Sequence, residues 1–143
     1  MSNDVCIFCK IIVKEIPSKI LYENNDTIAF LDIFPISQGH TIVIPKKHFT
    51  NLETIPINVL YGVMETVKIV SNLIYKNLNI DGYNILQNNY KAAGQVINHF
   101  HVHIIPRRSA DGKFKLLIPR EQVTEEELNQ TLKIINESKN LAF

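Results

Sequence analysis

The chain carries almost no excess charge of either sign, and it shows no long apolar run. Its 143 residues include 15 lysines and arginines against 14 aspartates and glutamates, a formal net charge of +1. Such a balance provides no field to steer long nucleic acids, so we expect no partner of that kind. We identify no apolar run of transmembrane length, no internal repeat and no low-complexity linker, so we expect no membrane partner either. The length fits one domain.

Histidine is also scarce, but three of the five histidines occupy one short segment, His99-Phe100-His101-Val102-His103. Strict alternation with apolar residues is typical of a strand that presents the histidines on one face. Next-but-one residues on a strand lie about 6.6 Å apart, so a single metal ion with bonds of about 2 Å could not bind all three. Burying three imidazoles costs free energy unless each has a partner. The pattern therefore favours chemistry on an extended group such as a phosphate diester.

The segment before the triplet adds polar groups. Residues 83–88 alternate as a second strand, and residues 89–95 form a turn that joins it to the histidines. Gly94 beside a small residue lets backbone N–H groups approach an anion, and Gln95 adds an amide donor. Alone, this turn would be an ordinary loop, but just ahead of three histidines it indicates a phosphate site.

The other two histidines flank a predicted buried strand at residues 41–44, which is β-branched throughout. His40 opens this strand and His48 lies beyond its end. Taken alone, His40 is equally compatible with a surface turn and with a functional site.

The chain has only two cysteines, Cys6 and Cys9, spaced Cys-x-x-Cys. They could form a redox pair, a disulfide, or two ligands of a tetrahedral metal. A thioredoxin-type pair follows a strand, and no strand is expected before these residues. The first ten residues lack the apolar core of a secretory signal, so we expect a cytoplasmic protein, where a structural disulfide is disfavoured. Zinc would need two more ligands, which His48 and one histidine of the triplet could supply.

Residues 93–106, Ala-Gly-Gln-Val-Ile-Asn-His-Phe-His-Val-His-Ile-Ile-Pro, resemble the signature of the histidine-triad (HIT) nucleotide-binding proteins. The resemblance also covers residues 6–12, 30–32 and 39–48, in the family's order and spacing. It implies an α+β fold with an antiparallel meander sheet, one long helix packed on it and a C-terminal helix. It further implies a homodimer whose sheets join into one, with a HIT domain at 5–108 and an extension at 109–143.

The same resemblance implies roles for individual residues. His101 matches the nucleophile that attacks the α-phosphorus, His103 matches a phosphate contact, and His40 matches a fourth histidine of the site. The implied nucleotide contacts are Asn88, Gly94, Gln95 and Val96 at the phosphate, Asp32 at the ribose, and Ile7, Phe8, Ile11, Phe30 and Ile33 around the base. The zinc-binding branch, which is similar to galactose-1-phosphate uridylyltransferases, implies a structural Zn²⁺ held by Cys6, Cys9, His48 and His99.

Two features depart from the family's pattern. Val96 stands where some relatives carry a serine or threonine that touches the phosphate, so only its backbone N–H is expected to serve. Everything after about Arg108 lies outside the shared pattern. In some relatives the tail shapes the partner subunit's pocket, so the resemblance leaves the choice of substrate open.

The remaining sequence predicts scaffold. Residues 21–24 and 27–32 form an expected hairpin around an Asn-Asp turn. Residues 56–78 form an expected helix whose apolar stripe is either core or dimer contact, and its members are Leu60, Val63, Met64, Val67, Val70 and Ile74. Thr124 and Glu127 predict a capping box for a C-terminal helix carrying Leu128, Leu132 and Ile135. A polar loop is expected at residues 109–115.

Together these features predict a hydrolase that moves a purine nucleoside monophosphate onto His101 and then to water. A neutral imidazole is a good nucleophile near neutral pH and a tolerable leaving group, which suits a covalent route. Phosphoramidates and adenylylated compounds are the first expected substrates, and dinucleoside polyphosphates are the second. A low-turnover nucleotide-binding regulator and a transferase to phosphate or a sugar phosphate are the alternatives.

Overall fold

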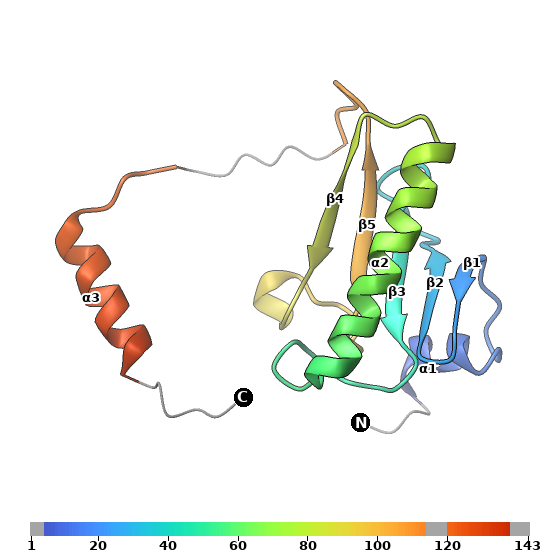
Figure 1. Ribbon diagram of the computed structural model, residues 1–143, viewed down its shortest axis with the longest axis horizontal. Coiled ribbons are helices and arrows are strands. Elements are labelled where there is room, and N and C mark those ends of the chain that lie inside the picture. Colours follow the sequence, from blue (N-terminus) through green and yellow to red (C-terminus); the bar gives the residue numbers. More distant parts are fainter. Residues whose placement is uncertain (1–4, 114–119, 138–143) are drawn as a thin grey trace.

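The computed structural model describes residues 5–113 and 120–137, and these contain one antiparallel sheet with a long helix on it (Figure 1). In chain order the elements are α1 (Ile7–Ile12), β1 (Ile20–Glu23), β2 (Thr27–Leu31), β3 (Thr41–Pro45), α2 (Ile57–Asn77), β4 (Gly82–Gln87), the 3₁₀ helix η2 (Lys91–Ala93), β5 (Val102–Arg107) and α3 (Glu125–Asn136). The predicted α+β class is confirmed. Helix α1 was not expected from the sequence.

The five strands pair in the order β1-β2-β3-β5-β4, and every pair is antiparallel. The predicted hairpin is present, because the Asn24 side-chain oxygen accepts the backbone N–H groups of Asp26 and Thr27 and closes the turn. The order departs from a simple meander at one point. After α2 the chain forms the edge strand β4 and then returns, so that β5 lies in the interior of the sheet, between β3 and β4.

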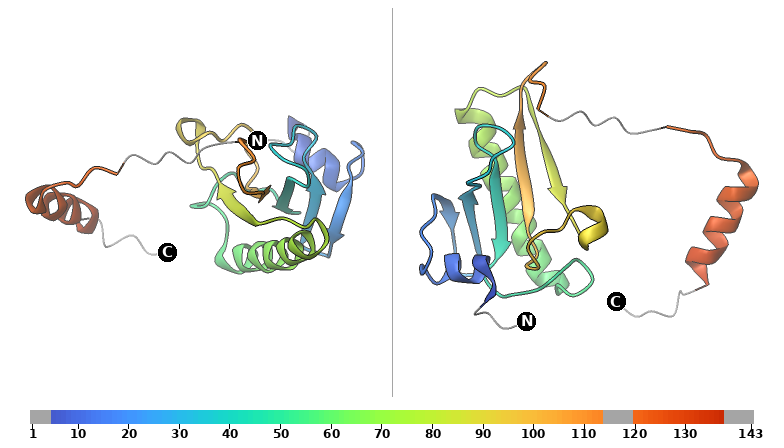
Figure 2. Two further views of the ribbon diagram at one scale, coloured as in Figure 1. Left: turned by 90° about the horizontal axis from the view of Figure 1, so that it is seen from above. Right: turned by 180° about the vertical axis from the view of Figure 1, so that it is seen from behind.

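The two faces of the sheet are covered by different helices, α2 on one side and α1 on the other (Figure 2), and they bury different groups of side chains. Alternate residues of a strand point to opposite faces. The α2 face is a continuous apolar core of Ala29, Val43, Ile55, Val63, Val67, Val70, Ile74, Ile80, Phe100, Val102 and Ile104. The other face packs against α1 through Cys6, Phe8, Cys9, Ile11, Ile28, Phe30, Ile42 and Ile44. The larger apolar cluster therefore lies under α2, while the second face combines a smaller apolar cluster with the candidate site.

Helix α2 directs its apolar stripe at the sheet. Val63, Val67, Val70 and Ile74 are buried, whereas Met64 on the flank is 43% exposed. The buried part of the predicted stripe therefore belongs to the core, which is the first of the two alternatives. A contact between copies through α2 would have to use its exposed flank.

By length and composition alone, α2 could also cross a membrane, with 21 residues and a mean hydropathy of 1.2 in its most apolar window. No apolar run of transmembrane length was expected from the sequence. One helix of this kind is weak evidence for a membrane span, because core helices of soluble proteins pass the same test. Part of the window, 33%, is buried here.

The predicted C-terminal helix and its cap are confirmed. The Thr124 hydroxyl accepts the Glu127 backbone N–H, and the Glu127 carboxylate accepts the Thr124 backbone N–H. No residue of α3 is buried, and Leu128, Leu132 and Ile135 are each more than half exposed. The polar loop predicted at 109–115 is described as far as residue 113, and its last two residues lie outside the described part of the chain.

Two glycines provide a matched test of this packing. Gly39 has φ +88°, and a Cβ there would overlap the side chain of Leu78 at the end of α2. Gly62 lies within α2, and a Cβ there meets no atom within 4 Å. We expect Gly39→Ala to lower the free energy of unfolding by about 1–3 kcal/mol and Gly62→Ala to raise it by about 0.5–1 kcal/mol. Urea denaturation measures both, and equal effects would contradict the two assigned environments.

Candidate functional site

The three histidines of the triplet lie on the α1 face of the sheet, as predicted, although the strand begins later than expected. Only His103 belongs to β5, while His99 and His101 precede it. The rings of His101 and His103 are 4.9 Å apart between centroids. Phe8 of α1 packs edge-on against both His99 and His101. The intervening Phe100, Val102 and Ile104 are all in the core under α2.

His101 is held in one protonation form by its neighbour. Its Nδ1 lies 2.7 Å from the backbone carbonyl oxygen of His99. A carbonyl can only accept, so Nδ1 carries the proton and donates it. Burial lowers the pKa of the imidazole, which the carbonyl contact and Asp32 partly offset, so the ring is neutral at pH 7. Its Nε2 therefore has a free lone pair, as a nucleophile requires.

A hydrogen-bonded chain behind the triplet fixes the form of His103. The backbone N–H of Ile36 donates to Nδ1 of His40 at 3.0 Å, so the proton of neutral His40 lies on Nε2. That Nε2–H donates to Nδ1 of His103 at 2.9 Å. His103 consequently carries its own proton on Nε2. Burial is the main cause that lowers both pKa values, that of His103 to about 4.

Asp32 adjoins this chain of hydrogen bonds. One carboxylate oxygen accepts the backbone N–H of Phe34 at 2.8 Å, and the other lies 3.6 Å from Nε2 of His40. Asp32, His40 and His103 offer three ligand atoms close enough for a metal. The proton assigned to Nε2 of His40 occupies the lone pair that a metal would need. The trio is therefore a hydrogen-bonded relay.

A cavity of about 540 Å³ opens on this face, bounded by α1, β2, β3 and the loop after β4. Eleven of the thirteen residues predicted for catalysis or nucleotide binding line it: Ile7, Phe8, Ile11, Phe30, Asp32, Ile33, Asn88, Gly94, Val96, His101 and His103. The two exceptions are His40, which bonds to His103, and Gln95. Sequence reasoning missed Ile16, Pro17, Ser18, Leu31, Phe34, Ile36, Ile42, Leu86, Ile97 and Ile105. Strand alternation could have found Ile42, which pairs with His103 across the sheet.

Gln95 has a different role from the predicted amide donor to phosphate. Its side chain accepts the backbone N–H of Tyr90 and donates to the carbonyl oxygens of Thr50 and Ile97. Both amide hydrogens are thus used within the protein, and the residue is buried. Gln95 ties the loop after β4 to the segment after β3. Its neighbour Gly94 has φ +92°, a conformation that favours glycine.

The two cysteines and the remaining two histidines form a separate cluster. The Nδ1 of His99 lies 3.6 Å from each sulfur of Cys6 and Cys9, and 3.1 Å from Nδ1 of His48. The Cys9 sulfur lies 3.3 Å from Nδ1 of His48. The Nε2 of His99 contacts the carbonyl oxygen of Pro45 at 2.8 Å, so that nitrogen holds the proton and Nδ1 is bare.

This donor set fits a tetrahedral zinc ion. Zinc bonds of about 2.0–2.3 Å place ligand atoms roughly 3.3–3.8 Å apart, close to the separations found here. Two sulfurs and two imidazole nitrogens converge here, and no disulfide joins the two cysteines. Desolvation raises the pKa of the Cys9 thiol to about 11, so without a cation this thiol would be neutral. A metal is the partner that would convert these buried thiols to thiolates.

Known proteins similar to this chain share both its sequence and its fold. The model of the HIT domain matches residues 13–110. An uncharacterized HIT-like protein of Methanocaldococcus jannaschii is 44% identical over 135 residues, covering 92% of this chain and 98% of that protein. An adenylylsulfatase of Arabidopsis thaliana is 46% identical over 111 residues, 78% of this chain and 56% of that protein. An adenosine 5'-monophosphoramidase of Saccharomyces cerevisiae is 45% identical over 113 residues, 79% of this chain and 68% of that protein.

Solved structures agree with these sequence relatives. The crystal structure of a HIT-family member from Bacillus subtilis superposes with a TM-score of 0.88 at 35% identity, covering 97% of this chain and 99% of that one. A zinc-bound histidine-triad protein of Mycobacterium smegmatis has a TM-score of 0.75 at 31% identity, covering 96% and 99%. The matched domain includes the histidine triplet, the hydrogen-bonded relay behind it and most of the pocket. This chain therefore belongs to the HIT family.

Proposed function

We propose that the protein is a nucleotide hydrolase that transfers a nucleoside monophosphate to His101 and then to water. The observation that carries this proposal is the state of His101. Its Nδ1–H is bonded to the His99 carbonyl, so the bare Nε2 is the nitrogen left for the cavity of about 540 Å³ that the residue lines. A fixed neutral imidazole beside a cavity of nucleotide size is suited to nucleophilic attack.

The lining of the cavity suits a nucleotide in one orientation. The base would lie between the apolar side chains contributed by α1 and β2, and Asp32 would accept hydrogen bonds from the ribose. The phosphate would then lie where Asn88, Gly94 and the backbone of Val96 meet the triplet. The side chain of Gln95 is committed to the loop, so we assign it a supporting role beneath the phosphate.

The protonation states determine what each histidine does. The Nε2 of His101 forms a bond to the α-phosphorus as the bond to the leaving group breaks, and that group departs with its electron pair. The modified ring keeps its Nδ1–H and becomes cationic, which makes it a good leaving group for the second step. Water then attacks the phosphorus, a proton passes to solvent, and the nitrogen–phosphorus bond breaks to restore His101.

His103 acts as a hydrogen-bond donor in this scheme. It is the last donor in a chain that runs from the Ile36 N–H through His40, and its Nε2–H would donate to the phosphate oxygens. A full proton transfer from neutral His103 would leave an imidazolate in the relay, because the Ile36 amide cannot supply a replacement. The relay therefore stabilises negative charge that grows on the phosphate in the transition state.

Similarity supports the substrate class. The Arabidopsis and yeast relatives are named as an adenylylsulfatase and an adenosine monophosphoramidase. Both names describe an adenylyl group bonded to a leaving group, so we place purine nucleoside phosphoramidates and adenylylated compounds first. Dinucleoside polyphosphates are the second candidate. A low-turnover regulator would bind AMP in the same cavity without releasing product.

We also propose a structural Zn²⁺ held by Cys6, Cys9, His48 and His99. The convergence of two sulfurs and two ring nitrogens, of which Nδ1 of His99 is bare, supports it. Four protein ligands leave no open position, so the ion would stabilise the site without taking part in the reaction. Two cysteines that are not joined by a disulfide agree with the reducing cytoplasm as the proposed location.

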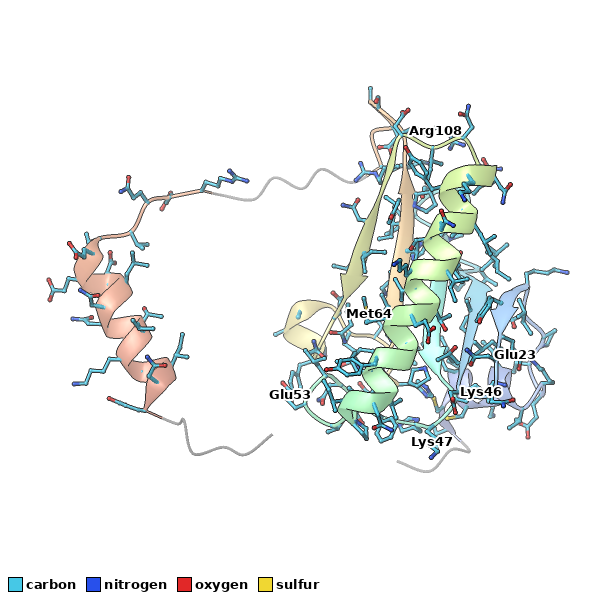
Figure 3. All side chains as sticks on the ribbon, in the orientation of Figure 1. Glu23, Lys46, Lys47, Glu53, Met64 and Arg108 are labelled. Carbon is cyan, nitrogen blue, oxygen red and sulfur yellow. The ribbon has the colours of Figure 1, made fainter. Side chains whose placement is uncertain are left out.

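A homodimer is proposed from the exposed edge of the sheet. Strand β4 is an edge strand, and Tyr83 and Ile85 on it are more than 40% exposed. They lie beside Met64 and Tyr75 of α2, which are also exposed, and Figure 3 shows Met64 on the outer side of that helix. An edge strand flanked by exposed apolar side chains is a typical pairing surface.

Replacing the nucleophile tests the mechanism. We expect His101→Ala to lower turnover on the order of 10⁴-fold or more, because it removes the covalent route while Asp32 and the apolar walls still hold the nucleotide. The AMP dissociation constant should change far less. The measurement is a turnover panel of adenosine phosphoramidate, adenylyl sulfate, an aminoacyl adenylate and diadenosine tri- and tetraphosphate, together with acid-labile labelling of His101. Near-normal turnover by the variant would refute the mechanism, and AMP binding without any turnover by the natural chain would favour the regulator.

Metal analysis of protein purified without added metal tests the zinc proposal. We expect about one zinc per chain, as a single Cys₂His₂ site requires. Cys6→Ser and His48→Ala should each reduce the zinc content and expose it to chelators, because each leaves three ligands. A Cys6–Cys9 disulfide in the native protein would contradict the site.

Light scattering tests the dimer. We expect twice the chain mass of 16.4 kDa at micromolar concentration. Ile85→Glu should shift the protein to monomer, because it places a charge on the proposed pairing surface. Val13→Glu is the matched control, since Val13 is exposed at the end of α1 and away from β4. The proposed pairing surface would be refuted if both variants were monomers, or if the natural chain were a monomer.

A further inference from the structure

His99 belongs to the metal cluster through its side chain and to the nucleophile through its backbone. Its Nδ1 faces Cys6, Cys9 and His48, while its carbonyl oxygen accepts the Nδ1–H of His101 at 2.7 Å. We propose that the metal ligands position the nucleophile and the pocket wall, so that zinc and nucleotide bind with coupled affinities. This inference rests on the proposed nucleotide site and adds a means by which metal occupancy controls it.

The first connection runs through the backbone of His99. Outside the metal cluster, the His99 ring forms a hydrogen bond from Nε2 to the Pro45 carbonyl, and this bond helps to fix its plane. A metal ion bound to Nδ1 would restrain the ring at a second atom and so hold His99 in one conformation. Because the His99 carbonyl determines which nitrogen of His101 is bare, an altered His99 backbone would misdirect the nucleophile. His99 is therefore a positioning residue.

The second connection runs through α1. Cys6 caps this helix by accepting the Cys9 backbone N–H on its sulfur, and both cysteines are in the metal cluster. A helix of six residues is too short to be stable by itself, so it depends on such anchors. Phe8 on α1 packs against His99, His101 and Phe30. Loss of the anchors would therefore loosen the wall against which a base would lie.

The third connection begins at His48. The next two residues offer carbonyl oxygens to the site, since Phe49 accepts the Phe100 backbone N–H at 2.6 Å and Thr50 accepts a Gln95 amide hydrogen at 2.7 Å. Phe100 lies between the metal ligand and the nucleophile. Gln95 supports the loop expected to hold the phosphate. Each element that carries a metal ligand thus also contacts the nucleotide cavity or its supports.

The metal cluster lies outside the core under α2. The coupling between zinc and AMP can therefore be measured without unfolding the protein. The apolar core under α2 contains none of the four metal ligands. The opposite cluster contains Cys6 and Cys9 together with Phe8 and Ile11 of the pocket wall. We expect chelation to leave the sheet and α2 intact while it loosens α1 and the His99 segment.

Thermodynamic reciprocity gives a strict test. If zinc raises the affinity for AMP by some factor, AMP must raise the affinity for zinc by the same factor. Couplings of this kind usually lie between about 5-fold and 150-fold. We expect a factor on the order of 10, measured as the ratio of AMP dissociation constants for chelated and zinc-loaded protein by calorimetry. The reverse factor comes from competition for zinc with a chromogenic chelator, with and without saturating AMP.

Two phenylalanine variants distinguish coupling through α1 from a general effect on the cavity. Phe8→Ala should reduce the coupling factor several-fold while zinc stays bound, because Phe8 links α1 to both histidine rings. Phe34→Ala is the control, since Phe34 also lines the cavity but is 84% exposed and lies after β2. It should change AMP affinity equally in loaded and chelated protein and so leave the factor unaltered.

The outcomes are distinct from those of the turnover panel, because only binding is measured. Coupled binding in a protein that hydrolyses nothing would keep this inference and refute the hydrolase. Equal AMP affinity with and without zinc, in chelated protein whose circular dichroism is native, would overturn the inference. Loss of the sheet on chelation would overturn it too, since zinc would then be a condition of folding. Loaded protein that binds no AMP would refute both proposals.

Discussion

The hydrogen bond from Nδ1 of His101 to the carbonyl of His99 is the contact on which the site depends. It spans two residues, yet it fixes the tautomer of the proposed nucleophile and joins it to a proposed metal ligand. A buried imidazole with its proton on Nε2 would present a donor to the cavity and could not attack. Burial makes the ring neutral and the carbonyl selects the tautomer, so position and reactivity follow from one interaction.

The division of the sheet into two faces lets the fold hold the three histidine rings without a large loss of stability. Residues 100, 102 and 104 face the dry core under α2, and alternation then places 99, 101 and 103 on the other face. Buried polar rings destabilise a core when they have no partners. Here each ring has one, because His99 reaches Pro45, His101 reaches His99, and His103 reaches His40. The segment ahead of β5 departs from regular strand pairing, and this lets the backbone at His99 accept a side-chain donor.

Much of this could be predicted from the sequence, and the misses have physical causes. Alternation, turn residues and a capping box predicted the strands and both long helices within a few residues. Helix α1 was missed because six residues give too little periodicity, and its cap is a cysteine. The triplet and the family resemblance predicted most of the pocket lining. Gln95 was assigned to the phosphate because a side chain's direction depends on tertiary partners, here the Thr50 and Ile97 carbonyls, which no local pattern reveals. The position of β5 inside the sheet was likewise set by long-range pairing.

The chain contains two histidine clusters with similar atoms but opposite chemistry. Backbone groups determine which cluster suits a cation and which directs hydrogen bonds toward an anion. At His99 the Pro45 carbonyl accepts the proton of Nε2, so Nδ1 is bare and faces the sulfurs of Cys6 and Cys9 and Nδ1 of His48. At His40 the Ile36 backbone N–H donates to Nδ1, so Nε2 carries the proton and donates it to Nδ1 of His103. The first arrangement attracts a cation, and the second directs hydrogen bonds toward an anion. Exchanging the two backbone partners would exchange the roles, which is why the residue types alone do not distinguish a metal ligand from a phosphate-binding relay.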